Sequence, residues 1–279
     1  MAYWQWGDEL SSHVVVCVHG LTRQGRDFDT LAQALCRPAR APIRVICPDV
    51  AGRGQSDWLQ DPTGYQIPAY AADMLVLLTH LRPTTLDWVG TSMGGVLGLI
   101  LCGQPDLPLP VPIRRLVLND VGPVMQWQAL QRIGEYLGQT GKFASLQEAA
   151  DALWATSSSF GPHTPAQWLA LSAPMVKPMP ECPACLTLRY DPAIAMPFRK
   201  VTPESVAQGE AMLWQLYDNI KAETLLIRGA QSDLLTLETA QAMTQRGPRA
   251  RLLQFDGVGH APTLVADDQV QAVTSFLLA

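Results

Sequence analysis

A serine framed by glycines stands out in the pentapeptide Gly90-Thr91-Ser92-Met93-Gly94. Apolar residues typical of a short strand precede this pentapeptide, and a helix-forming run follows it. A strand, a Gly-x-Ser-x-Gly turn and a helix in this order predict a nucleophile elbow, a tight turn that projects the serine hydroxyl clear of a sheet. The pattern therefore indicates that Ser92 is a nucleophile that attacks a carbonyl carbon.

A serine nucleophile needs a general base, because its hydroxyl is not ionised at neutral pH. Among five histidines, His260 lies in a glycine-flanked loop between the last expected strand and the last expected helix. The carboxyl ends of parallel strands meet at one edge of a sheet, so this loop lies at the same edge as the elbow. We expect His260 to be the base and His19, which follows an early strand, to order its own loop.

The base in turn needs an acid that fixes its tautomer and stabilises the imidazolium. Asp233 is the expected acid, because it follows the penultimate strand and precedes His260 by enough chain for one helix and one strand. Asp120 is the alternative, since it follows the strand after the elbow; it can equally be an N-cap or hinge residue. Asp49 is interpreted as ordering a glycine-rich turn.

Two backbone amides are candidates for an oxyanion hole. A glycine in His19-Gly20-Leu21 lets the chain bend toward the elbow, which brings the Leu21 N–H close to Ser92. The Met93 N–H lies at the start of the helix after the elbow, where amides have no partner within the helix. We therefore expect Leu21 and Met93 to bind the negatively charged oxygen that forms on attack.

Alternating apolar segments and helical periodicities position these residues. The pattern predicts an α/β fold, a doubly wound and mostly parallel sheet with helices on both faces. Trp4 and Trp6 alternate with polar residues and predict an edge strand. The further strands are expected at residues 13–18, 43–47, 86–89, 115–119, 224–228 and 251–255.

The strand–helix alternation stops between residues 122 and 202, a stretch rich in prolines and aromatic residues. It contains no convincing strand, and we interpret it as a mostly helical cap inserted after the strand that follows the elbow. The expected core domain is 1–121 and 203–279, and the cap (lid) insertion is 122–202. Helices are expected at residues 127–139, 145–155 and 165–171, with Ser145 capping the second and Thr202 the helix where the core resumes.

The aromatic residues of the cap make it a candidate for substrate binding. Trp127, Trp154 and Trp168 are candidate pocket residues, with packing inside the cap as the alternative, because periodicity does not show which side chains face a cleft. Arg189 is either a ligand for a substrate carboxylate or an ion-paired surface residue.

Composition excludes several classes of function. The net charge of −5, without a basic cluster, argues against a nucleic-acid partner. No apolar run approaches the ~20 residues of a membrane span, and no secretory signal is visible, so we expect a cytoplasmic protein. Cys182 and Cys185 have a CxxC spacing without a second pair, and we interpret them as loop cysteines rather than a metal or redox site. Neither a cofactor nor a metal is expected, and the expected partner is a small-molecule substrate.

Taken together, the motifs resemble the α/β-hydrolase fold family over nearly the whole chain. The resemblance rests on the elbow, the His19-Gly20 loop, the turn Pro48-Asp49-x-x-Gly52-x-Gly54-x-Ser56 and the ending Gly257-x-Gly259-His260. The 122–202 insertion lies where that family carries its cap domain. Haloalkane dehalogenases and soluble epoxide hydrolases use aspartate where Ser92 stands, and lipases of the Gly-Gly-Gly type differ after Gly20, so both groups are set aside.

The resemblance implies a capped, esterase-like serine hydrolase. Its expected substrate is a small-to-medium, hydrophobic carboxylic ester, thioester or lactone, cleaved through an acyl-enzyme on Ser92. Two alternatives use the same triad: a carbon–carbon bond hydrolase and a cofactor-free haloperoxidase or perhydrolase. A third alternative is a non-catalytic small-molecule receptor on the same fold.

Overall fold

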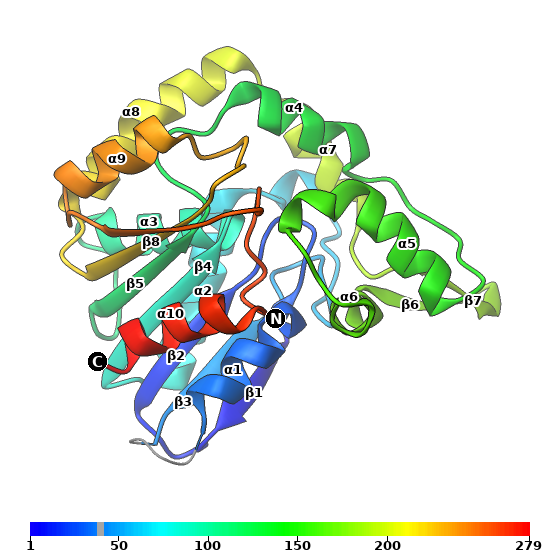
Figure 1. Cartoon of the computed structure of the whole chain (residues 1–279), viewed down its shortest axis with the longest axis horizontal. Coiled ribbons are helices and arrows are strands. Elements are labelled where there is room, and N and C mark those ends of the chain that lie inside the picture. The colour runs from blue at the N-terminus through cyan, green and yellow to red at the C-terminus, as the bar shows by residue number, and fades with distance from the viewer. Residues whose placement is uncertain (38–41) are drawn as a thin grey trace.

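A seven-stranded sheet forms the centre of the computed structural model, which describes residues 1–37 and 42–279 (Figure 1). The strand order is β1-β3-β2-β4-β5-β8-β9, and every neighbouring pair is parallel except β1 with β3. The α/β fold class and the edge strand that contains Trp4 and Trp6 are therefore confirmed, and this strand is the antiparallel one. The strands are β1 (Tyr3–Gly7), β2 (His13–Val18), β3 (Arg44–Pro48), β4 (Thr85–Thr91), β5 (Ile113–Asn119), β8 (Glu223–Gly229) and β9 (Arg251–Phe255).

Helices cover both faces of this sheet, which explains the continuous apolar run of β2. Val14 and Val16 pack on one face with α2 (Ile67–Leu81), α3 (Met93–Gly103), α8 (Pro203–Asn219) and α9 (Leu237–Gln245). Val15 and Cys17 point to the other face and pack with α1 (Asp29–Leu35) and α10 (Asp267–Leu277). All four side chains are fully buried, as expected for a strand covered on both sides. None of the helices in the described ranges is both long and apolar enough to cross a membrane.

Residues 122–202 lie outside the central sheet and extend to one side of it (green, Figure 1). Three of their α-helices lie close to the expected positions, a fourth at Ala195–Phe198 was not expected, and the caps at Ser145 and Thr202 are confirmed. Short 3-10 turns lie at 158–160, 173–175 and 192–194. The helices are α4 (Trp127–Tyr136), α5 (Leu146–Ser157), α6 (Pro165–Ser172) and α7 (Ala195–Phe198).

The expectation that this segment contains no strand is wrong. Strands β6 (Val176–Met179) and β7 (Cys182–Leu188) form an antiparallel hairpin. Prolines hide the strand pattern in the sequence, yet both members of a two-stranded sheet are edge strands, where proline is tolerated. Cys182 and Cys185, expected in a loop, lie in β7 and are joined by a disulfide bond.

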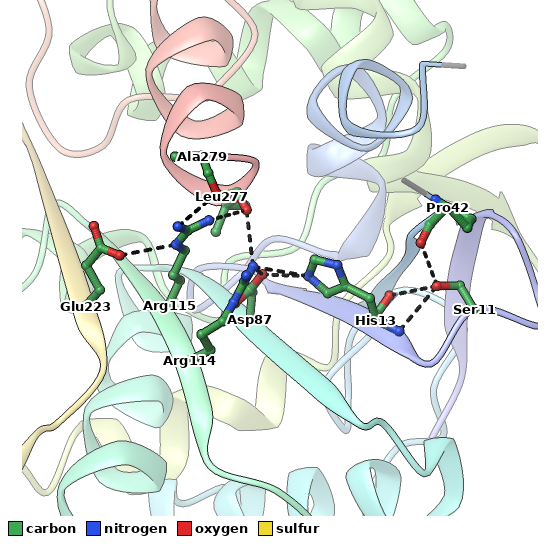
Figure 2. A network of polar contacts seen from close by, with 9 residues as sticks. All are labelled: Ser11, His13, Pro42, Asp87, Arg114, Arg115, Glu223, Leu277 and Ala279. Atoms are coloured by element: carbon green, nitrogen blue, oxygen red, sulfur yellow. Dashed lines mark hydrogen bonds and ion pairs between the residues drawn. The ribbon is translucent and has the colours of Figure 1, made fainter. Parts of the chain in front are cut away.

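A polar network joins strands at the edge of the sheet opposite the elbow (Figure 2). His13 Nε2 lies 2.8 Å from Asp87 Oδ2, and Arg114 makes two hydrogen bonds to the same buried carboxylate. Burial alone would raise the pKa of Asp87, but the bonds from His13 and Arg114 outweigh it and lower the pKa. Arg115 donates to the Leu277 carbonyl of α10. This network ties β2, β4 and β5 together, and it engages His13 away from Ser92.

Candidate active site

Ser92 occupies a strained turn between β4 and α3. Its backbone angles are φ 51° and ψ −115°, in the region that side chains rarely adopt. A Cβ atom at Gly90 would lie 2.2 Å from the Gly94 carbonyl oxygen, and one at Gly94 would lie 2.0 Å from the Val18 carbonyl oxygen. Only glycine allows the strand and the helix to pass this closely, so the geometry of the expected elbow is present.

His260 lies directly against the serine. Its Nε2 is 2.9 Å from Ser92 Oγ, and its Nδ1 is 2.7 Å from Asp120 Oδ2. The imidazole comes from the loop after β9 and is almost completely buried. Because the Asp120 carboxylate can only accept, Nδ1 carries the proton and Nε2 is free to accept the proton of Ser92.

The acidic partner of His260 is Asp120, so the expectation of Asp233 is wrong. Asp120 is fully buried, and its carboxylate also accepts hydrogen bonds from the Gly229 amide at 2.8 Å and from the Ser232 hydroxyl at 2.6 Å. Three donors therefore converge on one ionised carboxylate and fix its orientation toward the imidazole.

Asp233 has a different partner. Its half-exposed carboxylate receives two hydrogen bonds from Arg132 of α4, at 2.8 and 3.0 Å. The error has a geometric cause: β5 and β8 are neighbours, so the residues after both strands lie within reach of His260. The loop after β8 directs Ser232 inward to Asp120 and leaves Asp233 outside, a choice that depends on loop conformation and not on spacing.

The loop before α1 lies beside the elbow, as an oxyanion hole requires. A Cβ atom at Gly20 would lie 3.7 Å from the Ser92 Cβ, and the next residue, Leu21, lines the same cavity as Ser92 and Met93. Within the described parts of the chain, neither the Leu21 amide nor the Met93 amide has a protein acceptor. Both N–H groups are thus available donors next to Ser92.

His19 orders this loop, as expected. Its Nδ1 lies 2.7 Å from the Gly20 carbonyl oxygen, and its Nε2 accepts from the Val50 amide at 3.0 Å. One nitrogen donates and the other accepts, so the ring is neutral, and burial lowers the pKa of His19 to about 3. With both nitrogens engaged, His19 is no candidate for a base.

The glycine-rich turn is ordered by Asp49, again as expected. The Asp49 carboxylate accepts from the Gly25 and Gln55 amides, both at 2.8 Å. A Cβ atom at Gly54 would lie 2.3 Å from the same carboxylate, so glycine is required there.

Arg53, in the same turn, is a site residue that the sequence reasoning missed. It is fully buried, and burial lowers its pKa. Its Nε donates to the Leu21 carbonyl at 2.8 Å, Nη1 donates to the Tyr70 hydroxyl at 2.8 Å, and Nη2 lies 3.8 Å from the Met93 sulfur. The guanidinium therefore contacts both residues whose amides are expected to form the oxyanion hole.

Two cavities meet at Ser92. The larger, about 560 Å³, is lined mostly by apolar side chains of α4, α7 and α8 together with Met93. The smaller, about 130 Å³, is lined by His260, Arg132 and Tyr136 among others. No group of three or more metal-ligating side chains occurs in the described ranges.

The three expected tryptophans are not among the described residues that line either cavity. Trp154 and Trp168 contact each other edge to face, with ring centres 4.9 Å apart, and Trp168 Nε1 donates to the Ala150 carbonyl. Trp127 begins α4 and is half-buried. The pocket expectation is wrong for all three, and for Trp154 and Trp168 the alternative of packing inside the cap is confirmed.

Arg189 is likewise absent from the described walls of both cavities. Its Nε donates to the Val176 carbonyl at 3.0 Å, which holds the hairpin together.

A model of the Alpha/beta hydrolase family matches residues 15–273. The chain belongs to the α/β hydrolase family. It is 48% identical over 277 residues to a 3-hydroxybutyrate-oligomer hydrolase of Cupriavidus necator, covering 99% of this chain and 92% of the relative. A 2-hydroxy-6-oxo-2,4-heptadienoate hydrolase of Pseudomonas putida is 25% identical, covering 78% of this chain and 71% of the relative.

A solved α/β hydrolase from Novosphingobium aromaticivorans is similar to this α/β hydrolase in structure. The TM-score is 0.84 at 33% identity, covering 99% of this chain and 92% of that one. The hydrogen-bonded series of a serine hydroxyl, a buried imidazole and a buried carboxylate therefore lies at the edge of an α/β hydrolase sheet. Such a hydrogen-bonded series can activate a hydroxyl for attack on a carbonyl, beside two amide N–H groups that can donate hydrogen bonds to the oxyanion.

Proposed function

We propose that this α/β hydrolase is a serine esterase that cleaves short oligomers of 3-hydroxybutyrate and closely related hydroxy acid esters. The hydrogen-bonded chain Ser92–His260–Asp120 carries the proposal of ester hydrolysis. The substrate class is supported by the 48% identity with the Cupriavidus oligomer hydrolase, which extends over almost the whole of both chains.

In the proposed mechanism, His260 accepts the proton of Ser92 while Oγ attacks the ester carbonyl. Asp120 stabilises the imidazolium, and the Leu21 and Met93 amides bind the oxyanion. His260 then protonates the leaving alcohol, and water repeats the sequence to release the acid from the acyl-enzyme. Each cycle consumes one water and yields one alcohol, one carboxylate and one proton.

The cap is part of this proposal. Residues 122–202 supply walls of both cavities, whereas 1–121 and 203–279 supply the reacting groups. We propose that the first segment acts as the lid over the core domain formed by the other two.

A fluorophosphonate probe tests the nucleophile. Labelling of the wild-type protein that disappears in Ser92→Ala supports catalysis, whereas a folded wild-type protein that resists the probe would favour a non-catalytic receptor.

A substrate panel tests the bond that is cleaved. We expect the 3-hydroxybutyrate dimer and trimer to give higher kcat/KM values than a lactone, a thioester or a vinylogous diketone. Preferred turnover of the diketone would instead identify a carbon–carbon bond hydrolase.

A further inference from the structure

The two cavities that meet at Ser92 are unequal in size, charge and access to the base. The larger has apolar walls that include Val96, Leu130 and Leu213. The smaller is about a quarter as large, and His260 lines it but not the larger one. This asymmetry bears on which half of an ester occupies which cavity.

The leaving oxygen of a tetrahedral intermediate must lie within hydrogen-bond reach of the group that protonates it. That group is His260 Nε2, which lies 2.9 Å from Ser92 Oγ, and His260 lines the small cavity but not the large one. The alcohol half of the ester therefore lies in the small cavity, and the acyl half lies in the large one. At about 130 Å³ the small cavity has about a quarter of the volume of the large one, so it suits the shorter half of the ester.

The charge of the small cavity also favours binding of the alcohol half of a hydroxy acid ester there. Its described walls carry two guanidinium groups and no carboxylate. Arg23 is nearly buried, donates twice to Asp27 and donates once more to the Leu171 carbonyl. Arg132 is more accessible, with 36% of its side chain exposed. Its pair with Asp233 uses only Nε and Nη2, so a guanidinium with five N–H bonds keeps donors for a second acceptor.

Building on the proposed function, we propose that Arg132 binds the free carboxylate of the leaving hydroxy acid. Tyr136 lies beside Arg132 in the same wall, and burial raises the pKa of this phenol, so it stays a neutral donor. In a linear hydroxy acid oligomer, the unit released as alcohol by cleavage of the last ester bond is the one with the free carboxylate. The enzyme therefore removes single units from the carboxyl end, while the rest of the chain occupies the large cavity as the acyl group.

The direction of cleavage is tested with a 3-hydroxybutyrate trimer carrying ¹³C in its carboxyl-terminal unit. We expect labelled monomer and unlabelled dimer as the first products. Labelled dimer with unlabelled monomer would overturn the proposal, because the leaving alcohol in the small cavity would then be a dimer and not a single carboxyl-terminal unit.

The role of Arg132 is tested by comparing the trimer as free acid with its methyl ester. Arg132→Gln should raise KM for the free acid by about ten- to a hundredfold, the typical loss for a hydrogen bond to a charged group. KM for the methyl ester should stay within about twofold of the wild-type value, since this substrate has no free carboxylate for Arg132 to bind.

Two further variants separate recognition from a structural role. Asp233→Asn breaks the same ion pair but keeps the guanidinium, so a structural latch would be lost in both variants, whereas carboxylate binding is lost only in Arg132→Gln. Lys200→Gln removes the one cation among the described walls of the large cavity and should leave the ratio of the two KM values unchanged. A changed ratio of the two KM values in Lys200→Gln would refute the proposal. So would an equal rise of KM for the free acid in Arg132→Gln and Asp233→Asn.

The substrate class can fail separately from the subsite. If the enzyme hydrolyses p-nitrophenyl butyrate but no oligomer, the proposed function is wrong. Free 3-hydroxybutyrate then still tests Arg132: we expect competitive inhibition of p-nitrophenyl butyrate hydrolysis that weakens about tenfold or more in Arg132→Gln. Equal inhibition of wild type and variant would overturn the subsite.

Discussion

Replacing Asp120 by asparagine separates the two candidate acids. Asparagine keeps the shape of the side chain, and its amide oxygen can still accept from the Gly229 amide that now bonds Oδ1. Its NH₂ group then takes the place of Oδ2 and faces His260 Nδ1. An amide can only donate to that nitrogen, so the imidazole proton moves to Nε2, where the ring can no longer accept the proton of Ser92.

The size of the effect follows from this change of tautomer. Loss of the correct tautomer and of the charge that stabilises the imidazolium lowers kcat by about 10³- to 10⁴-fold in serine hydrolases. That corresponds to about 4–5.5 kcal/mol of transition-state stabilisation. KM should change little, since Asp120 is fully buried behind His260 and lines neither cavity among the described residues.

Asp233→Asn is the matched control. Asp233 is half exposed, and its pair with Arg132 is a surface interaction that contributes at most about 1 kcal/mol to stability. We expect kcat for a neutral ester such as p-nitrophenyl butyrate to stay within about twofold of the wild type.

Stopped-flow and steady-state rates with p-nitrophenyl butyrate measure both variants at pH 7.5, and circular dichroism checks that each is folded. A folded Asp120→Asn enzyme with more than about a tenth of wild-type kcat would refute the assignment, because a wrong tautomer cannot sustain it. A large loss in Asp233→Asn with a small loss in Asp120→Asn would restore Asp233 as the acid.

Three further variants probe the surroundings of the triad. Arg53→Met removes the donors that hold the Leu21 carbonyl and contact Met93. We expect kcat to fall by about ten- to a hundredfold with KM nearly unchanged, a smaller loss than that of a whole oxyanion donor. A rise in KM alone would contradict a positioning role. Gly209→Phe should fill the large cavity, because a Cβ atom at Gly209 meets nothing within 4 Å. We expect kcat/KM to fall for octanoyl esters but not for acetyl esters. Gly209→Ala keeps the space and should leave the octanoyl-to-acetyl ratio of kcat/KM unchanged. His19→Gln should reduce the acid sensitivity of folding, because the pKa of His19 is about 3 in the folded state and 6.5 in the unfolded state. Protonation of the unfolded state therefore lowers the wild-type free energy of unfolding as pH falls below 6.5, by about 2 kcal/mol at pH 5. Urea unfolding at pH 7.5 and pH 5 should show a smaller difference in this free energy for the variant.

Local patterns in the sequence were enough to predict the sheet, the elbow and the histidine that lies beside it. Ser92 is specified by glycines two residues on either side, whose missing Cβ atoms are required by contacts along the chain and with β2. His260 is specified by its place after the last strand. Both depend on topology, which strand–helix alternation reveals.

Features that depend on side-chain direction could not be predicted. Which tryptophans face a cleft depends on how cap helices rotate against each other, and Trp154 and Trp168 turn toward one another. Arg53 gave no signal, because a lone arginine between two glycines looks like a solvated turn residue. Its burial arises only when the Leu21 loop and Tyr70 of α2 fold over it.

The choice between Asp120 and Asp233 shows how one loop can serve both the triad and the cap. Ser232 and Asp233 are adjacent, and their side chains point to opposite sides: Ser232 donates to Asp120, and Asp233 accepts from Arg132. Because Asp120 already supplies the buried charge next to His260, Asp233 is free to hold a cationic side chain of α4 at the wall of the small cavity. A buried second carboxylate beside Asp120 would repel it and favour protonation of one of the two. Placing Asp233 outside, on Arg132, removes that conflict and positions a guanidinium where the leaving group departs.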